Sequence, residues 1–135
     1  MKKLLFIIVL LPYLFFSCET EVYDSGEFQY ENETEFDVLR NYRSMDEKLQ
    51  IRIDSIHDSR CPIGATCIWQ GEAKVFMTLI AEAENHLVLS TFDNQRDTLR
   101  NYEIILTDVL PHPDLSVETH PDDYKVVLQI NRLGN

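Results

Sequence analysis

The sequence has little positive charge: 12 Lys and Arg stand against 23 Asp and Glu, which gives a formal net charge of −11 at pH 7. Proteins that bind nucleic acids or anionic lipid surfaces use clusters of basic side chains to contact phosphates. We therefore expect no nucleic-acid partner. Any attachment to a membrane must come from something other than the overall charge of the surface.

Catalytic signatures are also missing. The sequence contains no HExxH motif, no nucleophile-elbow serine motif, no glycine-rich phosphate loop and no EF-hand pattern. Carboxylates are numerous, but in so acidic a chain they do not single out an acid/base pair. We expect no enzymatic activity, no catalytic residues and no cofactor. An envelope hydrolase is the least favoured class, because it would need a pocket with perturbed carboxylates.

Metal-binding and redox patterns are sparse as well. The five residues between Cys61 and Cys67 fit neither the two-residue redox spacing nor common zinc-knuckle spacings. The four histidines show no close pairing at metal-ligand spacing, and we predict no metal site. The alternative is a carrier of a small ligand or metal that uses the Pro/His loop 111–122, which contains His112 and His120.

Long hydrophobic runs are absent except at the N-terminus. Lys2 and Lys3 precede an apolar run from Leu4 to Phe16, the layout of a secretory signal. A span of the hydrocarbon core needs about 20 residues, so a transmembrane anchor is the weaker interpretation of this run.

The end of this run predicts lipidation. The segment "LFFSC" resembles a bacterial lipobox, with Ser17 directly before Cys18, although Phe15 stands where leucine is usual. We expect 1–17 to be a lipoprotein signal peptide and Cys18 to be acylated, for example with palmitate, which would anchor the protein in the outer membrane on its periplasmic or outer face. The alternative is an unprocessed or disulfide-bonded Cys18. Acylation is favoured because it leaves Cys61 and Cys67 as an even pair in an oxidising compartment.

An acidic stretch follows the cysteine. Residues 18–37 contain eight acidic residues and no Lys or Arg. Such a segment repels itself, so we expect a flexible, solvated tether. The remaining residues, 38–135, suit one small domain.

Within this domain the hydrophobic periodicity is close to two, which predicts strands. The clearest run starts at Cys67, where odd positions as far as Ala83 are apolar or small. It places Trp69 on the inward face and predicts a bend near Gly71. Other strands are expected at 49–53 and from His86, Tyr102 and Asp123, while 36–45 fits a short strand or a helical turn. The pattern predicts an all-β fold, an antiparallel β-sandwich or small barrel of about six or seven strands.

The stretch "DSRCPIGATCIWQGEA", residues 58–73, concentrates the rarer residue types. Cysteine parity and spacing favour a structural disulfide between Cys61 and Cys67 over a metal site with His57 or a redox site. Trp69 is expected either to pack on that disulfide or to contact a partner. Asp58, Arg60 and Glu72 are expected to form an ion pair that fixes the loop, with an anion receptor built on Arg60 as the alternative.

These residues resemble the DSRCP…C-x-W-x-G signature of a family of small exported bacterial proteins and lipoproteins. The matching positions are Asp58, Ser59, Arg60, Cys61, Pro62, Cys67, Trp69, Gly71 and Glu72. Gln70 stands where the family often has alanine. The resemblance implies an exported protein and leaves its activity open, since the family has no established biochemical role. We therefore expect a non-enzymatic binding or structural β-domain in the cell envelope, with an envelope protein or glycan as its partner.

Overall fold

Nine strands and one short 3-10 helix form in residues 25–134, the part of the chain that this computed structural model describes. The expected signal peptide (1–17) and Cys18 lie outside the described residues. In chain order the elements are β1 (Gly26–Phe28), β2 (Glu33–Asp37), β3 (Asn41–Ser44), β4 (Gln50–Asp58), β5 (Ala73–Ile80), β6 (Glu84–Ser90), β7 (Arg96–Leu99), β8 (Tyr102–Leu110), η1 (Pro121–Asp123) and β9 (Lys125–Arg132).

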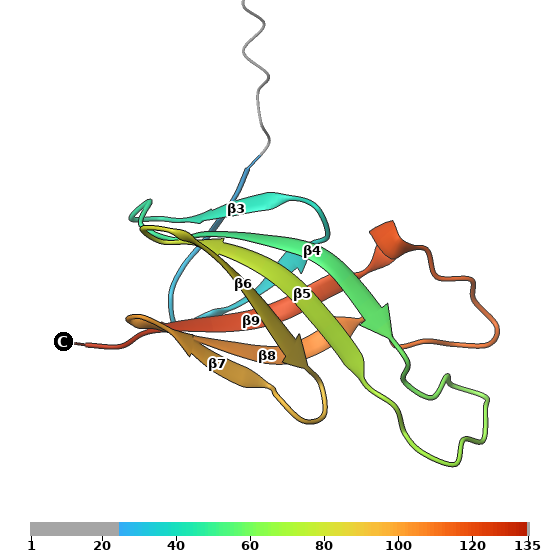
Figure 1. Ribbon diagram of the computed structural model, residues 1–135. Coiled ribbons are helices and arrows are strands. Elements are labelled where there is room, and N and C mark those ends of the chain that lie inside the picture. The colour runs from blue at the N-terminus through green and yellow to red at the C-terminus, as the bar shows by residue number, and fades with distance from the viewer. Residues whose placement is uncertain (1–24, 135) are drawn as a thin grey trace, which may run out of the picture.

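The strands form two sheets that face each other as a β-sandwich (Figure 1). One sheet has the order β1-β3-β4-β5-β6 and the other the order β2-β9-β8-β7. All pairings are antiparallel except that of β1 with β3. The predicted all-β sandwich is confirmed, with more strands than the six or seven expected.

The core lies between the sheets and follows the period-two pattern. Ile51, Ile53, Val75, Met77 and Leu79 point inward from β4 and β5 and are almost fully buried. The partner sheet contributes a matching set, Ile104, Leu106, Val109, Val126, Leu128 and Ile130. The register of β4 against β5 shifts between Ile53 and Ser55, at the point where the sequence pattern of β4 also changes face.

The predicted boundary between tether and domain at Val38 is wrong. β1 and β2 both lie within 18–37 and pair with β3 and β9. Phe28 and Phe36 are buried in the core, and their rings lie 5.6 Å apart. The acidic side chains of β2 tolerate this position because β2 is an edge strand, where Glu33 and Glu35 alternate outward as Phe36 points inward. The folded domain therefore includes β1 and β2.

The long strand predicted from Cys67 to Ala83 is also shorter than expected. β5 covers only Ala73–Ile80, and a turn at 81–83 leads into β6. Gly71 has a φ of 70°, in the left-handed region, so the alternation of faces does not continue through it. In the undecided segment 36–45, β2 ends and β3 forms without a helical turn.

The connections divide between the two ends of the sandwich (Figure 1). At one end lie the long β4–β5 loop, which contains the two cysteines, and the Pro/His loop between β8 and β9. At the other end lie the short turns β3–β4, β5–β6 and β7–β8, together with the end of β9. These two ends carry different chemistry.

Candidate functional site

A disulfide closes the β4–β5 loop. Sγ of Cys61 and Sγ of Cys67 are 2.09 Å apart, and their Cα atoms are 5.9 Å apart. Backbone hydrogen bonds continue the pairing of β4 and β5 into the loop, from Ser59 N to Glu72 O (2.8 Å) and from Cys61 N to Gln70 O (2.7 Å). The predicted disulfide is confirmed, and it holds the loop as a stiff extension of two central strands.

Arg60 connects this loop to the opposite sheet. Its Nη2 lies 2.6 Å from Oδ2 of Asp58, and the two side chains are only 9% and 5% exposed. Nη1 donates to the carbonyl oxygen of Val109 at 2.7 Å, and Nη2 donates to that of Pro111 at 2.9 Å. The guanidinium thus fixes the end of β8 against the end of β4, which is the structural role expected of it.

The electrostatics of the pair follow from its enclosure. Burial alone would raise the pKa of Asp58, but the hydrogen bonds and charge of Arg60 outweigh burial and leave that pKa below its ordinary value. The Tyr124 hydroxyl also bonds this carboxylate, and burial together with the charge of Asp58 raises the pKa of Tyr124. With Asp58 already as its counter-ion, Arg60 has little capacity left for an external anion.

Glu72 belongs to a different cluster from the Asp58–Arg60 pair. Its carboxylate accepts a hydrogen bond from the hydroxyl of Ser90 and lies 3.1 Å from Nζ of Lys74. These two contacts, the Ser90 hydrogen bond above all, lower the pKa of Glu72. The ion pair expected among these residues is formed by Asp58 and Arg60, and Glu72 takes no part in it.

Trp69 lies on the surface, so the prediction that it points inward is wrong. The residue is 56% exposed, and its ring packs edge-on against Phe92, with 5.8 Å between ring centroids. Phe92 is itself 49% exposed, and the neighbouring Ile68 side chain is fully in solvent. Trp69 was assigned to the inward face by extending the alternation of β5 back through Gly71. The left-handed conformation of Gly71 interrupts this alternation, which is also why the predicted strand was too long. Sequence reasoning gave Phe92 no functional role, because it counted this residue as the end of the strand expected from His86, whereas β6 ends at Ser90.

A polar cavity of about 300 Å³ adjoins the Phe92 ring. Phe92 forms part of its wall, and Gln70, Gln95, Asp108 and His112 supply polar groups. The ring nitrogen Nε2 of His112 forms a hydrogen bond with the carbonyl oxygen of Cys61 at 3.0 Å, which connects the Pro/His loop to the disulfide loop. Ile63 N, which donates to Pro113 O at 2.8 Å, makes a second connection between these loops.

Within residues 25–134, no group of three or more His, Cys, Asp or Glu side chains is arranged to hold a metal ion. The same residues contain no helix that is long and apolar enough to cross a membrane. The carrier function considered for loop 111–122 stays a prediction without a supporting cluster. At this end of the sandwich, Trp69 on the disulfide-closed β4–β5 loop packs against Phe92 of the β6–β7 connection, and polar amides lie in the adjoining cavity.

Comparisons with known proteins found no match: no family model, no curated protein and no solved structure matches the chain. The class that the fold and the site define is a disulfide-stapled β-sandwich with an exposed aromatic pair at one end.

Proposed function

We propose that the protein is a lipid-anchored component of the bacterial cell envelope whose β-sandwich is a non-enzymatic binding module. In this proposal the disulfide-loop end of the sandwich contacts an envelope protein or glycan. The observation that carries it is the pair of Trp69 and Phe92, two large aromatic rings packed on each other and both about half exposed.

Exposed aromatic pairs of this kind suit binding. Tryptophan is enriched at the energetic centres of interfaces, since a large ring buries much apolar area when a partner covers it. Ile68 extends the apolar surface, and the side-chain amides of Gln70 and Gln95 in the adjoining cavity offer hydrogen bonds to a polar partner. A binding surface that combines apolar and polar groups fits either a protein or a sugar.

The loop is also held rigidly before any partner arrives. The disulfide, the Arg60 bonds to Val109 and Pro111, and the His112 bond to Cys61 all restrain it. A surface that is already ordered loses less conformational entropy on binding. The contacts that stabilise the β4–β5 loop therefore also favour binding at its surface.

Membrane attachment and the outer-membrane location rest on the sequence: the short signal, the lipobox-like "LFFSC" and the parity of the cysteines. In the sequence, only residues 19–25 separate Cys18 from the start of β1 at Gly26. The domain would therefore stay close to the membrane surface.

The test is a crosslinking pull-down from cells that make the lipidated protein, carried out with the wild type and with Trp69→Ala. We expect one crosslinked species, protein or glycan, that depends on Trp69 and is lost in the variant. The matched control is Leu133→Ala, which removes an exposed apolar side chain from the other end of the sandwich, and it should leave the species unchanged. Equal crosslinking by the wild type and Trp69→Ala would reject this binding surface.

The anchor is tested separately with Cys18→Ser. The variant should leave the membrane fraction if Cys18 carries the lipid. A Cys18→Ser protein that stays membrane-bound would contradict the lipoprotein assignment without bearing on the Trp69 surface.

A further inference from the structure

A second cavity lies at the opposite end of the sandwich, among the short turns. Its volume is about 360 Å³. Four elements meet there: the β3–β4 turn supplies Lys48, the β5–β6 turn supplies Glu82, the β7–β8 turn supplies Arg100, and β9 ends with Arg132. The ring of Tyr102 and the methyl group of Ala81 provide apolar lining.

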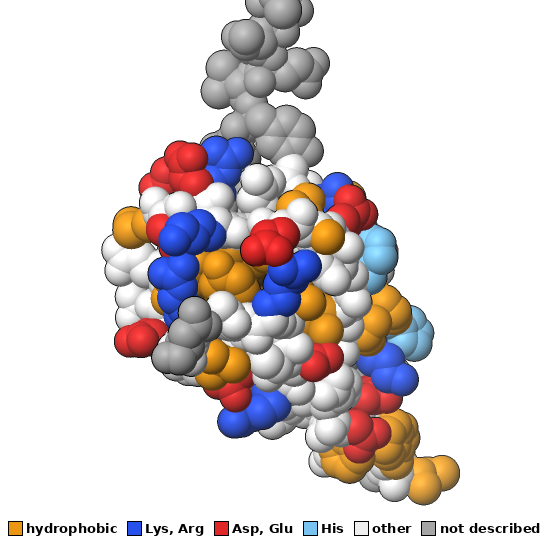
Figure 2. All heavy atoms as spheres, turned by 60° about the vertical axis from the view of Figure 1, so that its left-hand side comes forward, with side chains coloured by type: hydrophobic (Ala, Val, Ile, Leu, Met, Phe, Trp, Pro, Cys, Tyr) orange, Lys and Arg blue, Asp and Glu red, His pale blue; other side chains and the backbone are white. Residues whose placement is uncertain are grey.

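The charge of this cavity is the reverse of that of the chain. Residues 25–134 contain ten Lys and Arg and twenty Asp and Glu, once Lys2, Lys3 and three acids before residue 25 are set aside. The cavity nevertheless brings together three cations and one carboxylate. Figure 2 looks toward this side of the molecule, and blue side chains lie on both sides of an orange area there. Positive potential is therefore concentrated at one place on an acidic surface.

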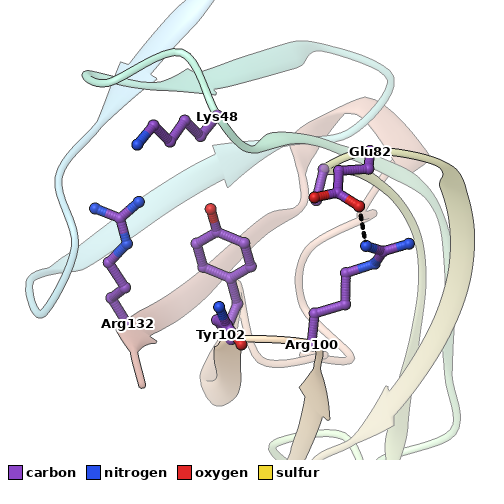
Figure 3. A pocket seen from close by; sticks show the side chains of 7 residues that line it. Lys48, Glu82, Arg100, Tyr102 and Arg132 are labelled. Atoms are coloured by element: carbon purple, nitrogen blue, oxygen red, sulfur yellow. Dashed lines mark hydrogen bonds and ion pairs between the residues drawn. The ribbon is translucent and has the colours of Figure 1, made fainter. Parts of the chain in front are cut away.

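Lys48 and Arg132 face the cavity from one side. In Figure 3 the amine of Lys48 and the guanidinium of Arg132 both lie to the same side of the Tyr102 ring. No hydrogen bond or ion pair of the Lys48 side chain is found among the described residues. Arg132 is held in place, because its guanidinium lies 5.5 Å from the centre of the Tyr30 ring and 3.2 Å from Oδ2 of Asp46. The pair thus combines Lys48, whose amine has no counter-ion within residues 25–134, with Arg132, whose guanidinium is oriented by Asp46 and Tyr30.

Arg100 completes the set from the other side. It forms an ion pair with Glu82, which joins the β5–β6 and β7–β8 turns across the two sheets (Figure 3). Its φ is 54°, a left-handed conformation that hairpin turns normally assign to Gly or Asn. An arginine at this turn position is locally unfavourable, yet it is the position from which the side chain reaches the cavity.

We propose that this cavity binds a small molecule that carries a phosphate group, with Lys48 and Arg132 as its ligands and the Tyr102 ring against the rest of the molecule. A phosphate monoester carries close to two negative charges at pH 7 and has three acceptor oxygens. It can therefore accept hydrogen bonds from both cations at once. A single carboxylate would add little to what Asp46 and Glu82 already provide.

The size and lining of the cavity indicate more than a free phosphate ion. A body such as a sugar ring or a glycerol unit can fill the remaining volume and pack on the Tyr102 ring. Whether the ligand is a sugar phosphate or a lipid headgroup depends on whether a sugar ring or a glycerol unit fits the cavity better. This inference does not depend on the Trp69 surface or on the lipid at Cys18, which belong to other parts of the chain.

Titration calorimetry of the purified full-length chain tests the proposal, with inorganic phosphate, glucose phosphate and glycerol phosphate as probes and uncharged glucose as the neutral control. We expect at least one phosphate ester to bind at low salt and glucose not to bind. Lys48→Gln and Arg132→Gln should each weaken binding about tenfold, since each removes one charge-assisted hydrogen bond. Lys74→Gln is the matched control, because Lys74 pairs with Glu72 at the other end of the sandwich.

Tighter binding of glucose phosphate identifies a sugar phosphate as the ligand, and tighter binding of glycerol phosphate identifies a lipid headgroup. Both results support the proposal. It is overturned if none of the three phosphates binds, or if Lys48→Gln and Arg132→Gln, shown to be folded by circular dichroism, bind as tightly as Lys74→Gln.

Discussion

Asp58 and Arg60 form the most enclosed of the ion pairs found in the described residues: Oδ2 of the carboxylate lies 2.6 Å from Nη2 of the guanidinium, with both side chains withdrawn from solvent. The Arg60 guanidinium also bonds the carbonyl oxygens of Val109 and Pro111. A charge left without its partner in such a site is costly. The residue pair therefore links the loop that carries the motif to the stability of the whole sandwich.

Replacing Arg60 by Ala should destabilise the protein strongly. The variant leaves the Asp58 carboxylate enclosed without its cation and removes the hydrogen bonds that Arg60 donates to two carbonyl groups. We expect a loss of about 2–4 kcal/mol in the free energy of unfolding. Urea unfolding at pH 7 measures it. The control is Arg96→Gln, which breaks an exposed pair with Glu103 and should cost less than about 1 kcal/mol. Equal losses of unfolding free energy in the two variants would show that the burial of Arg60 does not add to the stability of the protein.

Acid should weaken the fold in a way that depends on Asp58. The folded-state pKa of this carboxyl is lowered, so the stabilisation it provides is complete above its unfolded pKa of about 3.9 and is lost as the pH falls through the lower folded value. Stability should change little between about pH 5 and 7 and should fall below about pH 4. Urea midpoints across this range should decline less steeply for Asp58→Asn than for the wild type. Parallel declines would assign the acid sensitivity to other carboxyls, such as Asp37, whose pKa is lowered by its hydrogen bonds from Lys125 and Tyr42.

The disulfide should add a modest and separable stabilisation. Closing a ring of about seven residues restricts the unfolded chain by about 2 kcal/mol in the loop-entropy model. The double variant Cys61→Ser/Cys67→Ser should lose that amount in thermal or urea unfolding. Adding a reductant should lower the stability of the wild type to that of the double variant and leave the variant unchanged. A wild type that is unaffected by complete reduction would contradict the role assigned to this bond.

Gly71 should be far less tolerant of a side chain than Gly64. Both have positive φ, 70° and 87°. A Cβ at Gly71 would lie 1.8 Å from the carbonyl oxygen of Ser59, whereas at Gly64 the nearest atom, in Leu115, is 3.9 Å away. Gly64→Ala should cost about 1 kcal/mol from backbone strain alone, and Gly71→Ala should cost clearly more, because the β4–β5 loop must shift. Melting temperatures of the two variants compare them directly, and equal values would mean that the close approach at Gly71 is not maintained.

The sequence predicted the elements whose pattern is local. Alternation of apolar residues marked β4 and β8, and cysteine parity marked the disulfide. The bend expected near Gly71 is where the strand pattern stops, but parity counted through that residue assigned Trp69 to the wrong face. In physical terms, a left-handed residue resets the alternation of faces, and a sequence does not show which glycine adopts it.

Other features depend on contacts between distant segments and could not be predicted in this way. The acidic composition of 18–37 concealed β1 and β2, although Phe28 and Phe36 were the signal of a buried face. The basic cavity joins Lys48, Arg100 and Arg132 from a turn in one sheet, a turn in the other and the end of the last strand. No short motif contains these residues, because their proximity is created by the pairing of the two sheets.

The corrected boundary of the domain leads to a prediction about truncation. A chain that starts at Val38 lacks β1 and β2, and with them the buried side chains of Phe28 and Phe36. Burial of each of these side chains contributes about 2–3 kcal/mol to the stability of the fold. The truncation also leaves β9 without its neighbour on one edge and removes the bonds from Tyr42 and Lys125 to Asp37. Because small domains are stable by only about 5–15 kcal/mol, we expect this chain to be unfolded by circular dichroism, whereas a chain that starts at Ser25 keeps both strands and should unfold cooperatively. A cooperative transition in the shorter chain would restore Val38 as the start of the domain and make β1 and β2 an attachment to an independently stable sandwich.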